Sequence, residues 1–406
     1  MDQKTKYAGR FLETSLGLAS GSVDPGTVSR EFVDSLSDAV KGSEGSGSAM
    51  PLLEAAAQEV GHDIVQSILD TRGFVLWKER WPKGARFAAC LTHDVDHLSW
   101  PVSHLMSQRS RFSAADFLLG LIGARNLYDN TPLAVQMERQ RNLRSSFYFL
   151  TDTYDLRPKA RLLASIRDQG WDVGLHGEFG THDSLDNMRL AIANLNQAIN
   201  VRPAGVREHF LHFDFGSTWK IMDDAGFIYD STVGNTDKAG FRIGLCNPFH
   251  PPNEDWEPLK LLEIPLGLMD TTLWGYLKRS EREGLNDFLN LKKGVMEVGG
   301  LFTILWHPES FRMRGGRIYP KLLDMLVADG CFIGSGLDIA RWWLRREAPL
   351  LREGKTFRMG DAAPGLVLGL KSKAGEAVKL AGGTLRTENG LQSIEALGGP
   401  LEVTLQ

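Results

Sequence analysis

The chain has 406 residues, of which 42% are hydrophobic and 24% are charged, as in ordinary soluble globular proteins. This length exceeds that of one average domain and predicts a barrel-sized domain with smaller units beside it. The formal net charge of -4 supplies no general attraction for nucleic acid or for an anionic membrane. We therefore exclude nucleic acid as a partner.

The N-terminus and the cysteines predict a cytoplasmic protein. The first residues include Asp2 and Glu13 and contain no continuous apolar stretch, so we expect no secretory signal. The longest apolar stretch, residues 117–124, is shorter than the ~20 residues that span a bilayer, so we expect no membrane span. The cysteines are odd in number and far apart, which predicts reduced core residues. They are Cys90, Cys246 and Cys331.

Three segments follow one another along the chain. Residues 1–80 have a helical pattern, interrupted by the run GSEGSGS at 42–48, which is typical of a flexible linker or loop. From residue 86 to 346, short β-rich runs alternate with amphipathic helical stretches, which indicates βα units around a parallel sheet. Residues 354–406 contain short alternating segments punctuated by glycine, which predicts a small all-β unit resembling a sandwich.

The middle segment predicts an α/β fold, a (β/α) barrel of seven or eight strands. Its expected strands are residues 87–92, 146–151, 171–175, 204–208, 227–229, 261–265, 301–306 and 331–335. Helix signals lie between them: Pro158 begins one helix, Asp183 or Ser184 caps another that runs to about Asn200, and Ser217 caps a third that ends at Gly226.

Ionisable residues follow or end several of these strands. In a parallel barrel all carboxyl ends of the strands open onto one face, so these side chains are expected to converge there. They are Asp94, Asp96, His176, Arg207, Asp230 and His307.

Asp94 and Asp96 lie in the sequence THDVDH, directly after the first strand of the barrel. Period-two alternation turns both carboxylates to one side and His93 to the other. Two neighbouring carboxylates repel each other unless a cation neutralises them or one becomes protonated. A divalent metal bound by one of them leaves the other as a base. The alternative interpretation is a polar turn with solvated acids.

Five motifs in order carry a resemblance to a known family. LTHDVDH, GWDVGLHGEFGTH, GVREHF, GFIYDST and FTILWHPE resemble the motifs of the polysaccharide deacetylase family, also called NodB homology or carbohydrate esterase family 4. A bacterial group with HDVDH and GLHG patterns is the nearer likeness, and the resemblance spans about residues 86–343. It implies a distorted (β/α) barrel that removes N- or O-acetyl groups from sugars with a divalent metal, commonly zinc.

The resemblance also implies a metal site. Asp94 corresponds to the catalytic base, whereas Asp96 and His176 correspond to metal ligands. The family places a second histidine ligand four residues after the first, where this chain has Gly180. His182 is the preferred replacement. Two alternatives remain open, namely His209 and, less favoured, His97.

The remaining roles follow in the same way. Arg207 corresponds to the arginine that orients the catalytic base, and His307 to the acid that protonates the leaving group. Asp230 corresponds to the acid that tunes His307, although it also suits a simple turn cap. The aromatic residues Trp306 and Phe210 are candidates for contact with a sugar ring.

These expectations combine into a metal-dependent carbohydrate deacetylase. Its partner would be an acetylated sugar or glycan in surface-polysaccharide or glycoconjugate biosynthesis, and its cofactor a divalent metal, most simply zinc. One alternative on the same fold is a deformylase or a hydrolase of a small cyclic amide. Another is a catalytically silent glycan-binding protein, motivated by the absence of a histidine at position 180.

Overall fold

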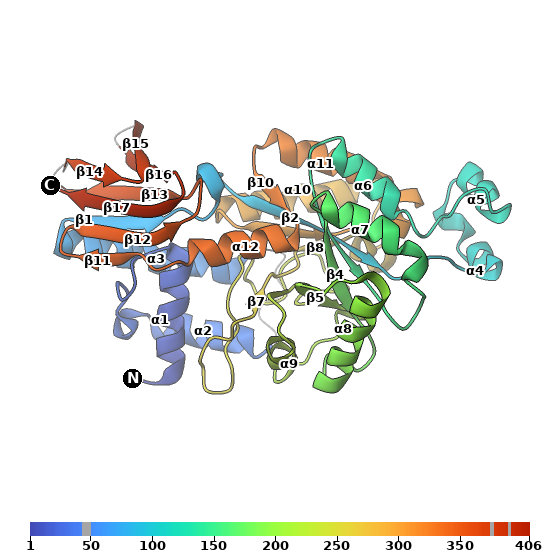
Figure 1. The fold of residues 1–406 in the computed structure, drawn as a ribbon, viewed down its shortest axis with the longest axis horizontal. Helices are drawn as coiled ribbons and strands as arrows, with labels where there is room; N and C mark the ends of the chain where they lie inside the picture. The colour runs from blue at the N-terminus through green and yellow to red at the C-terminus, as the bar shows by residue number, and fades with distance from the viewer. Residues whose placement is uncertain (43–49, 374–376, 389–390) are drawn as a thin grey trace.

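The computed structural model describes residues 1–42, 50–373, 377–388 and 391–406. Of the predicted linker at 42–48, residues 43–48 lie outside this description. The molecule is elongated, with a β-rich unit at one end, a barrel in the middle, and the short helices α4 (Val102–Ser107) and α5 (Ala114–Leu121) at the other end (Figure 1). No helix among the described residues combines the length and apolar character that a membrane span requires.

The N-terminal segment packs its helices against the barrel. Its helices are α1 (Gln3–Leu16), α2 (Arg30–Val40) and α3 (Leu52–Arg72). Tyr7, Phe32 and Leu36 are buried in the same hydrophobic core as the barrel strands. Apart from the linker or loop at 42–48, this segment was expected to be helical, but residues Phe74–Lys78 form the strand β1. Strand β1 pairs antiparallel with a strand of the C-terminal unit, so the two ends of the chain share one sheet.

The central sheet is parallel and curls into a distorted (β/α) barrel, as predicted. Hydrogen bonds join its strands in the order β7-β6-β5-β4-β3-β2-β9-β8, and β10 pairs with β2. The strands are β2 (Ala88–Val95), β3 (Ser146–Phe149), β4 (Asp172–Gly177), β5 (Gly205–Glu208), β6 (Tyr229–Asp230), β7 (Leu262–Glu263), β8 (Leu268–Met269), β9 (Leu301–Leu305) and β10 (Phe332–Gly334). Each predicted strand region overlaps one of these strands, whereas the two-residue β8 was not predicted.

The barrel is open between β7 and β8. Among the described residues no strand pairing joins β7 to β8, and residues 264–267 connect the two strands across the opening. In that segment, Leu266 N donates to Val233 O and Gly267 N donates to Thr303 O, at 2.9 and 3.0 Å. These two bonds satisfy backbone groups that a closing strand pair would otherwise satisfy.

Helices cover the outside of the barrel and begin where the sequence indicates. Ser184 caps α8 (Leu185–Ile199) by accepting a hydrogen bond from Asn187 N, and Gly226 ends α9 (Thr218–Ala225) with a φ of 83°. The other helices are α6 (Thr131–Arg139), α7 (Ala160–Asp168), α10 (Glu281–Glu297), α11 (Tyr319–Ala328) and α12 (Gly336–Arg346).

The C-terminal unit consists of two antiparallel sheets with a shared core. Their strand orders are β1-β13-β16-β15 and β11-β12-β17-β14, and the rings of Phe74 and Phe357 meet edge to face across the sheets at 6.0 Å. The predicted boundary at residue 354 lies just after β11, which pairs with β12. The strands are β11 (Leu351–Glu353), β12 (Thr356–Ala362), β13 (Val367–Ser372), β14 (Val378–Ala381), β15 (Gly383–Glu388), β16 (Leu391–Ala396) and β17 (Gly399–Leu405).

Arg346, the last residue of α12, joins the N-terminal segment to the rest of the molecule. Its side chain is buried and donates hydrogen bonds to the backbone carbonyls of Thr14, Ser15, Lys78 and Glu79, at 2.8 to 3.2 Å. The first two carbonyls belong to the C-terminal turn of α1, where few helical donors remain; the carbonyl of Thr14 also accepts from Gly17 N at 3.1 Å. Arg346 thereby satisfies carbonyls from two segments that it brings together.

We expect Arg346→Met to lower the free energy of unfolding by about 3 kcal/mol, because several buried carbonyls lose their donor at once. Thermal and urea unfolding measure the loss. The matched control is Arg345→Met, since Arg345 is exposed on the same helix and should change stability little. Equal stability of both variants would contradict this role of Arg346.

Candidate active site

Side chains from four barrel strands, or from the residues just after them, meet at the carboxyl ends of the strands. Asp94 is the residue before the last one of β2 and Asp96 follows the strand, His176 lies in β4, Arg207 lies in β5, and His307 lies two residues after β9. His176 Nε2 lies 3.8 Å from Asp94 Oδ2 and 3.2 Å from Asp96 Oδ1, so both carboxylates face the same side of β2. These groups form one cluster, which we call the strand-end cluster.

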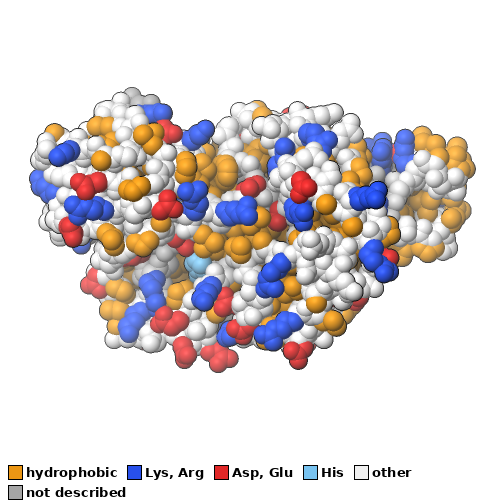
Figure 2. Space-filling model, viewed as in Figure 1, with side chains coloured by type: hydrophobic (Ala, Val, Ile, Leu, Met, Phe, Trp, Pro, Cys, Tyr) orange, Lys and Arg blue, Asp and Glu red, His pale blue; other side chains and the backbone are white. Residues whose placement is uncertain are grey.

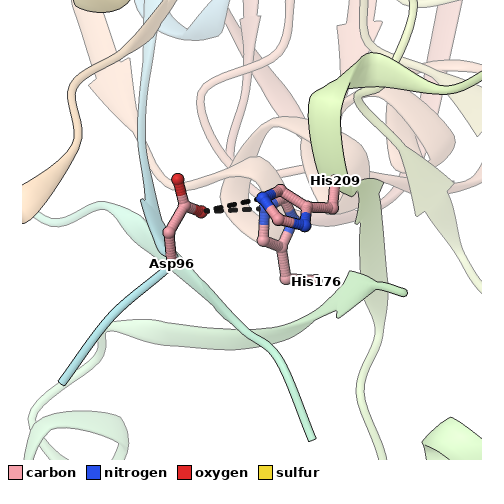
Figure 3. Close-up of side chains that lie close together, drawn as sticks. All are labelled: Asp96, His176 and His209. Atoms are coloured by element: carbon pink, nitrogen blue, oxygen red, sulfur yellow. Dashed lines mark ion pairs between the residues drawn. The ribbon is translucent and has the colours of Figure 1, made fainter. Parts of the chain in front are cut away.

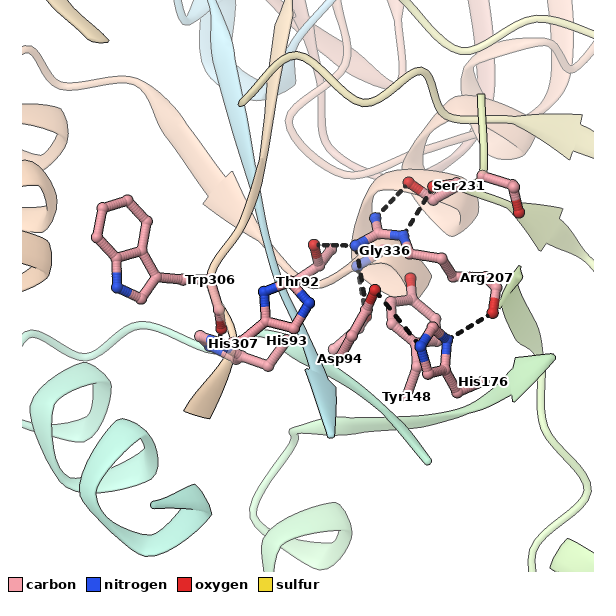
Figure 4. A network of polar contacts seen from close by, with 12 residues as sticks. Thr92, His93, Asp94, Tyr148, His176, Arg207, Ser231, Trp306, His307 and Gly336 are labelled. Carbon is pink, nitrogen blue, oxygen red and sulfur yellow. Dashed lines mark hydrogen bonds and ion pairs between the residues drawn. The ribbon is translucent and has the colours of Figure 1, made fainter. Parts of the chain in front are cut away.

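Arg207 is completely buried and holds Asp94. One of its terminal nitrogens lies 3.3 Å from Asp94 Oδ1 and donates to Thr92 Oγ1 at 2.8 Å (Figure 4). The other nitrogens of the guanidinium donate to the carbonyl and hydroxyl oxygens of Ser231, both at 2.8 Å. The guanidinium therefore has fixed partners on three sides, and its positive charge balances the buried carboxylate of Asp94.

Asp96, His176 and His209 form a group that can hold a metal ion. One potential ligand atom from each lies within 4.8 Å of the others (Figure 3). His176 Nδ1 donates to the carbonyl of Arg207 at 2.8 Å, so Nε2 is the ring nitrogen that faces Asp96. Asp96 Oδ1 is buried without a hydrogen-bond partner among the described residues, although both imidazoles face it.

The charge states of Asp96 and His209 also fit a metal ion. Burial opposes protonation of His176, but the carboxylates of Asp94 and Asp96 outweigh it and raise the pKa of His176 above its ordinary value. Burial alone would raise the pKa of Asp96, but His176 and His307 lower it below the usual value, so that Asp96 is ionised. Burial and the neighbouring His176 lower the pKa of His209 to about 4, which leaves a neutral imidazole at neutral pH. One carboxylate and two imidazoles are a ligand set that zinc accepts, with further positions open to water or substrate.

The third residue of this group is His209, not His182, which the sequence favoured. His182 lies in the turn before α8, where its Nε2 is 3.9 Å from Asp183 and its ring faces His212. His209 instead begins the short 3₁₀ turn His209–Leu211 directly after β5, and the next residue, Phe210, has a φ of 58°. This turn keeps His209 at the end of its strand, with its ring 5.0 Å from that of His176.

His307 is paired with Asp270, which the sequence did not single out. His307 Nδ1 lies 2.6 Å from Asp270 Oδ1, and its backbone N–H donates to Asp270 Oδ2 at 2.9 Å. Burial opposes protonation of His307, but the carboxylate of Asp270 raises its pKa well above the ordinary value. Asp270 follows the two-residue strand β8, so its only sequence signal was an acid after a short apolar run.

Asp230, predicted to tune His307, is buried beside Glu263 instead. Asp230 Oδ1 accepts hydrogen bonds from Thr232 N and Thr232 Oγ1, and Glu263 Oε2 accepts one from Trp219 Nε1 at 2.9 Å. Burial raises the pKa of Asp230 to about 6, and burial and Asp230 raise that of Glu263 well above its usual value. The two carboxyls are therefore stable together when one of them carries a proton.

The two predicted aromatic contacts differ in exposure. Trp306 is fully buried and packs against Trp274 and Tyr319, so it cannot stack on a sugar ring. Phe210 has 58% of its surface exposed, and its ring stacks on that of His209 at 4.0 Å. Phe179, 75% exposed and 6.3 Å from Phe210 between ring centres, extends this aromatic rim.

Comparisons with known proteins bear on the fold. No family model matches the chain, and no curated protein matches it. A solved structure of a provisionally assigned polysaccharide deacetylase from Mycobacterium smegmatis shares 19% identity with it; the match covers 67% of this chain and 95% of that one, with a TM-score of 0.50. Another, from Pseudomonas aeruginosa, shares 18% identity over 66% and 94% of the two chains, with a TM-score of 0.49. The chain thus has the barrel fold of the first of these proteins.

We expect His209→Gln to weaken zinc binding by roughly 100-fold or more, because one of three protein ligands is lost. Calorimetric titration of the metal-free protein with Zn²⁺, checked by elemental analysis, measures the change. The matched control is His182→Gln, which should leave zinc affinity unchanged. The reverse pattern would contradict the assignment of His209, rather than His182, to the candidate metal group.

We expect Glu263→Gln to change the pH dependence of stability. In the unfolded chain both acids lose their protons near pH 4, whereas in the folded protein their pKa values are raised. Their contribution to stability is therefore complete below about pH 4 and is lost as the pH rises. The variant places an amide donor beside Asp230 without binding a proton. As the pH rises from 5 to 8, the free energy of unfolding of the variant should therefore increase relative to that of the wild type.

The exposed Glu59→Gln is the control for this measurement, and its difference from the wild type should stay constant over the same range. A constant difference for Glu263→Gln as well would mean that the two buried carboxyls share no proton.

Proposed function

We propose that this protein is a member of the polysaccharide deacetylase family and removes an acetyl group from a sugar with the help of a bound divalent metal. A single observation carries this proposal. A carboxylate with two imidazoles lies beside an arginine-held carboxylate and an aspartate-held histidine, all at one barrel mouth. Hydrolysis of an amide or ester needs an activated water, an electrophile and a proton donor, and this cluster contains residues for each requirement.

Asp96, His176 and His209 would hold the metal, with zinc as the simplest choice. When bound, such an ion supplies Lewis-acid polarisation of the acyl carbonyl and makes water more acidic. Asp94 would then accept the proton of the attacking water. The guanidinium of Arg207 keeps the Asp94 carboxylate oriented, since it lies 3.3 Å from Oδ1 and has its own fixed partners in Thr92 and Ser231.

His307 would donate a proton to the leaving amine or alcohol. Its Nδ1 is engaged by Asp270, so its Nε2 is the nitrogen that faces the strand-end cluster, 3.7 Å from Asp96 Oδ2. A raised pKa keeps this imidazole protonated at neutral pH, which suits a general acid. Asp270 would act as a positioning residue for His307, the role that the resemblance alone attributed to Asp230.

The rim of the site suits a sugar. Phe179 and Phe210 expose aromatic rings next to His209, and such rings pack against the apolar faces of pyranoses. The biosynthesis of a surface polysaccharide or glycoconjugate is the setting that we propose for this substrate. A silent glycan-binding protein was motivated by the glycine at position 180, and His209 would supply the imidazole that this position lacks.

We expect Asp94→Asn to lower the rate of acetate release from acetylated chito-oligosaccharides or acetylated xylan by roughly 10²- to 10⁴-fold, because the base is lost. The zinc content should remain that of the wild type, since Asp94 is not in the ligand group. Enzymatic detection of acetate and elemental analysis of the same samples measure both quantities. Formylated analogues assayed in parallel separate deacetylation from deformylation.

Asp168→Asn is the control, because Asp168 is exposed at the end of α7 and its side chain is paired with Arg167. It should release acetate at the wild-type rate. Zinc-loaded Asp94→Asn that is as active as the wild type would overturn the assignment of Asp94, and a zinc-loaded wild type that releases no acyl group would favour a silent binding protein.

A further inference from the structure

The short helices α4 and α5 form a projection at one end of the molecule. The chain leaves the carboxyl end of β2, forms both helices and returns to the barrel (Figure 1). Asn126 Nδ2 donates to the carbonyl of Leu98 at 2.7 Å and joins the two ends of this excursion. We call residues 101–125 the helical tip. Its small core is separate from that of the barrel and contains Leu105, Phe112, Leu127, Tyr128 and Met313.

The outward face of the helical tip is apolar. Among residues 114–124 every exposed residue is alanine, leucine, isoleucine or glycine, and the one charged residue, Asp116, is buried. Leu118 and Ile122 are 60% and 68% exposed and lie one helical turn apart, as do the exposed Val102 and Met106 of α4. Figure 2 shows hydrophobic side chains gathered over α4 and α5. The exposed face of a helix in water normally carries polar residues, so this face indicates a surface that becomes covered.

Arginines surround the base of the helical tip. The segment after β9 lies beside it, and Arg314 N donates to the carbonyl of Arg111 at 2.8 Å. Residues 101–125 and 309–317 together contain six arginines but only two acids, whereas the whole chain has a net charge of -4. Folding thus builds a basic region that the overall charge does not reveal. The arginines are Arg109, Arg111, Arg125, Arg312, Arg314 and Arg317, and the acids are Asp116 and Glu309.

Part of this positive charge is free to meet a partner. The buried carboxylate of Asp116 lies 2.5 Å from Arg125 and 2.6 Å from Arg317. Arg109 and Arg314 are exposed, and neither forms an ion pair with another residue that the structure describes. These two side chains therefore offer unpaired cations beside the apolar face.

The helical tip adjoins the mouth of the barrel. His97 directly follows Asp96 of the strand-end cluster, and its ring lies 4.1 Å from that of Trp100. The ring of Trp100 stacks in turn on that of His104 in α4, with 3.8 Å between the ring centres. A row of three rings thus leads from the strand-end cluster to the helical tip. A surface bound by the helical tip would consequently lie near the barrel mouth.

An anionic lipid bilayer fits both parts of this surface. Apolar side chains of an interfacial helix enter the boundary between headgroups and acyl chains, and arginines beside them contact the lipid phosphates. A second copy of the same face fits poorly, because a symmetric contact would bring two sets of arginines together. A peptide helix fits poorly as well, since it binds in a groove, whereas the helical tip projects from the molecule (Figure 1).

We propose that the helical tip docks on the surface of an anionic lipid bilayer. The exposed apolar residues of α4 and α5 would lie among the lipids, and Arg109 and Arg314 would contact the phosphates. Docking would bring the barrel mouth to the bilayer, so the acetylated sugar would be one that is carried on a lipid. This substrate class rests on the proposed deacetylase activity, whereas the docking surface does not.

Co-sedimentation of the full chain with lipid vesicles tests the docking. The protein should bind vesicles of equal parts phosphatidylglycerol and phosphatidylcholine at least about tenfold more tightly than pure phosphatidylcholine vesicles. Added salt should weaken this binding, because it screens the arginines. Absence of binding to the mixed vesicles would overturn the proposal. Equal affinity for both kinds of vesicle would also overturn it, since the arginines would then have no role.

The double variant Leu118→Ser/Ile122→Ser tests the apolar face. It should bind the mixed vesicles about tenfold or more weakly, because two exposed apolar side chains no longer enter the bilayer. Its Tm should stay that of the wild type, since both residues are exposed. The matched control is Leu190→Ser, which changes an equally exposed leucine on α8 and should leave the affinity unchanged. Equal losses in both variants would overturn the assignment of the helical tip.

The double variant Arg109→Gln/Arg314→Gln tests the cations. It should weaken binding to the mixed vesicles about tenfold or more and leave binding to pure phosphatidylcholine unchanged. Arg189→Gln/Arg282→Gln is the control, because these arginines are exposed on α8 and α10. Analytical ultracentrifugation addresses the other occupant. A wild-type dimer that Leu118→Ser/Ile122→Ser dissociates, together with absence of vesicle binding, would replace the bilayer by a second copy of the chain.

Acetate release separates the docking from the deacetylase activity. From an N-acetylglucosamine glycolipid in the mixed vesicles, Leu118→Ser/Ile122→Ser should release acetate about tenfold more slowly than the wild type. From soluble acetylated chito-oligosaccharides both proteins should release it equally. Equal rates on the glycolipid would overturn the lipid-carried substrate. A wild type that binds the vesicles and releases no acetate from either substrate would overturn the deacetylase activity and support the docking.

Discussion

The architecture of the strand-end cluster depends on one buried cation, Arg207. Its guanidinium joins β2, through Asp94 and Thr92, to the residue that follows β6, through Ser231, and it also lies over the ring of Tyr148 in β3. A charge at such depth is tolerable only because a carboxylate and several oxygen acceptors surround it. The carbonyl of the same residue orients His176. A single residue thus positions both the carboxylate proposed as a base and one proposed metal ligand.

A second layer of polar contacts supports the cluster from behind. His93, which alternation turns away from Asp94, contacts Glu138 and the carbonyl of Trp306 inside the protein. Glu138 in turn accepts hydrogen bonds from Tyr319, Trp171 and Ser145. Every oxygen of this buried carboxylate is therefore engaged, which fixes the ends of β2 and β9 relative to each other. The fixed strand ends hold His307 Nε2 and Asp96 Oδ2 3.7 Å apart, which is too far for a direct hydrogen bond.

The ends of the chain are integrated with the barrel. Strand β1 enters a sheet of the C-terminal unit, and Arg346 satisfies carbonyls of α1 and of the stretch around β1. The N-terminal segment shares one hydrophobic core with the barrel, and the C-terminal unit shares another with it, so the three segments form one folded unit.

The sequence by itself determined the parallel barrel, the position of eight of its strands, and the convergence of Asp94, Asp96, His176, Arg207 and His307, because periodicity and strand ends are local properties. It did not determine which partner each side chain meets. Asp270 follows a strand of two residues, too short for a periodic signal, and His209 reaches the cluster through a turn whose path depends on Phe210. Asp230 pairs with Glu263 because β6 and β7 are neighbours in the sheet, and Trp306 is buried because α11 packs over it. Only the tertiary structure decided these pairings, since each joins residues that are distant in the sequence or separated by an irregular turn.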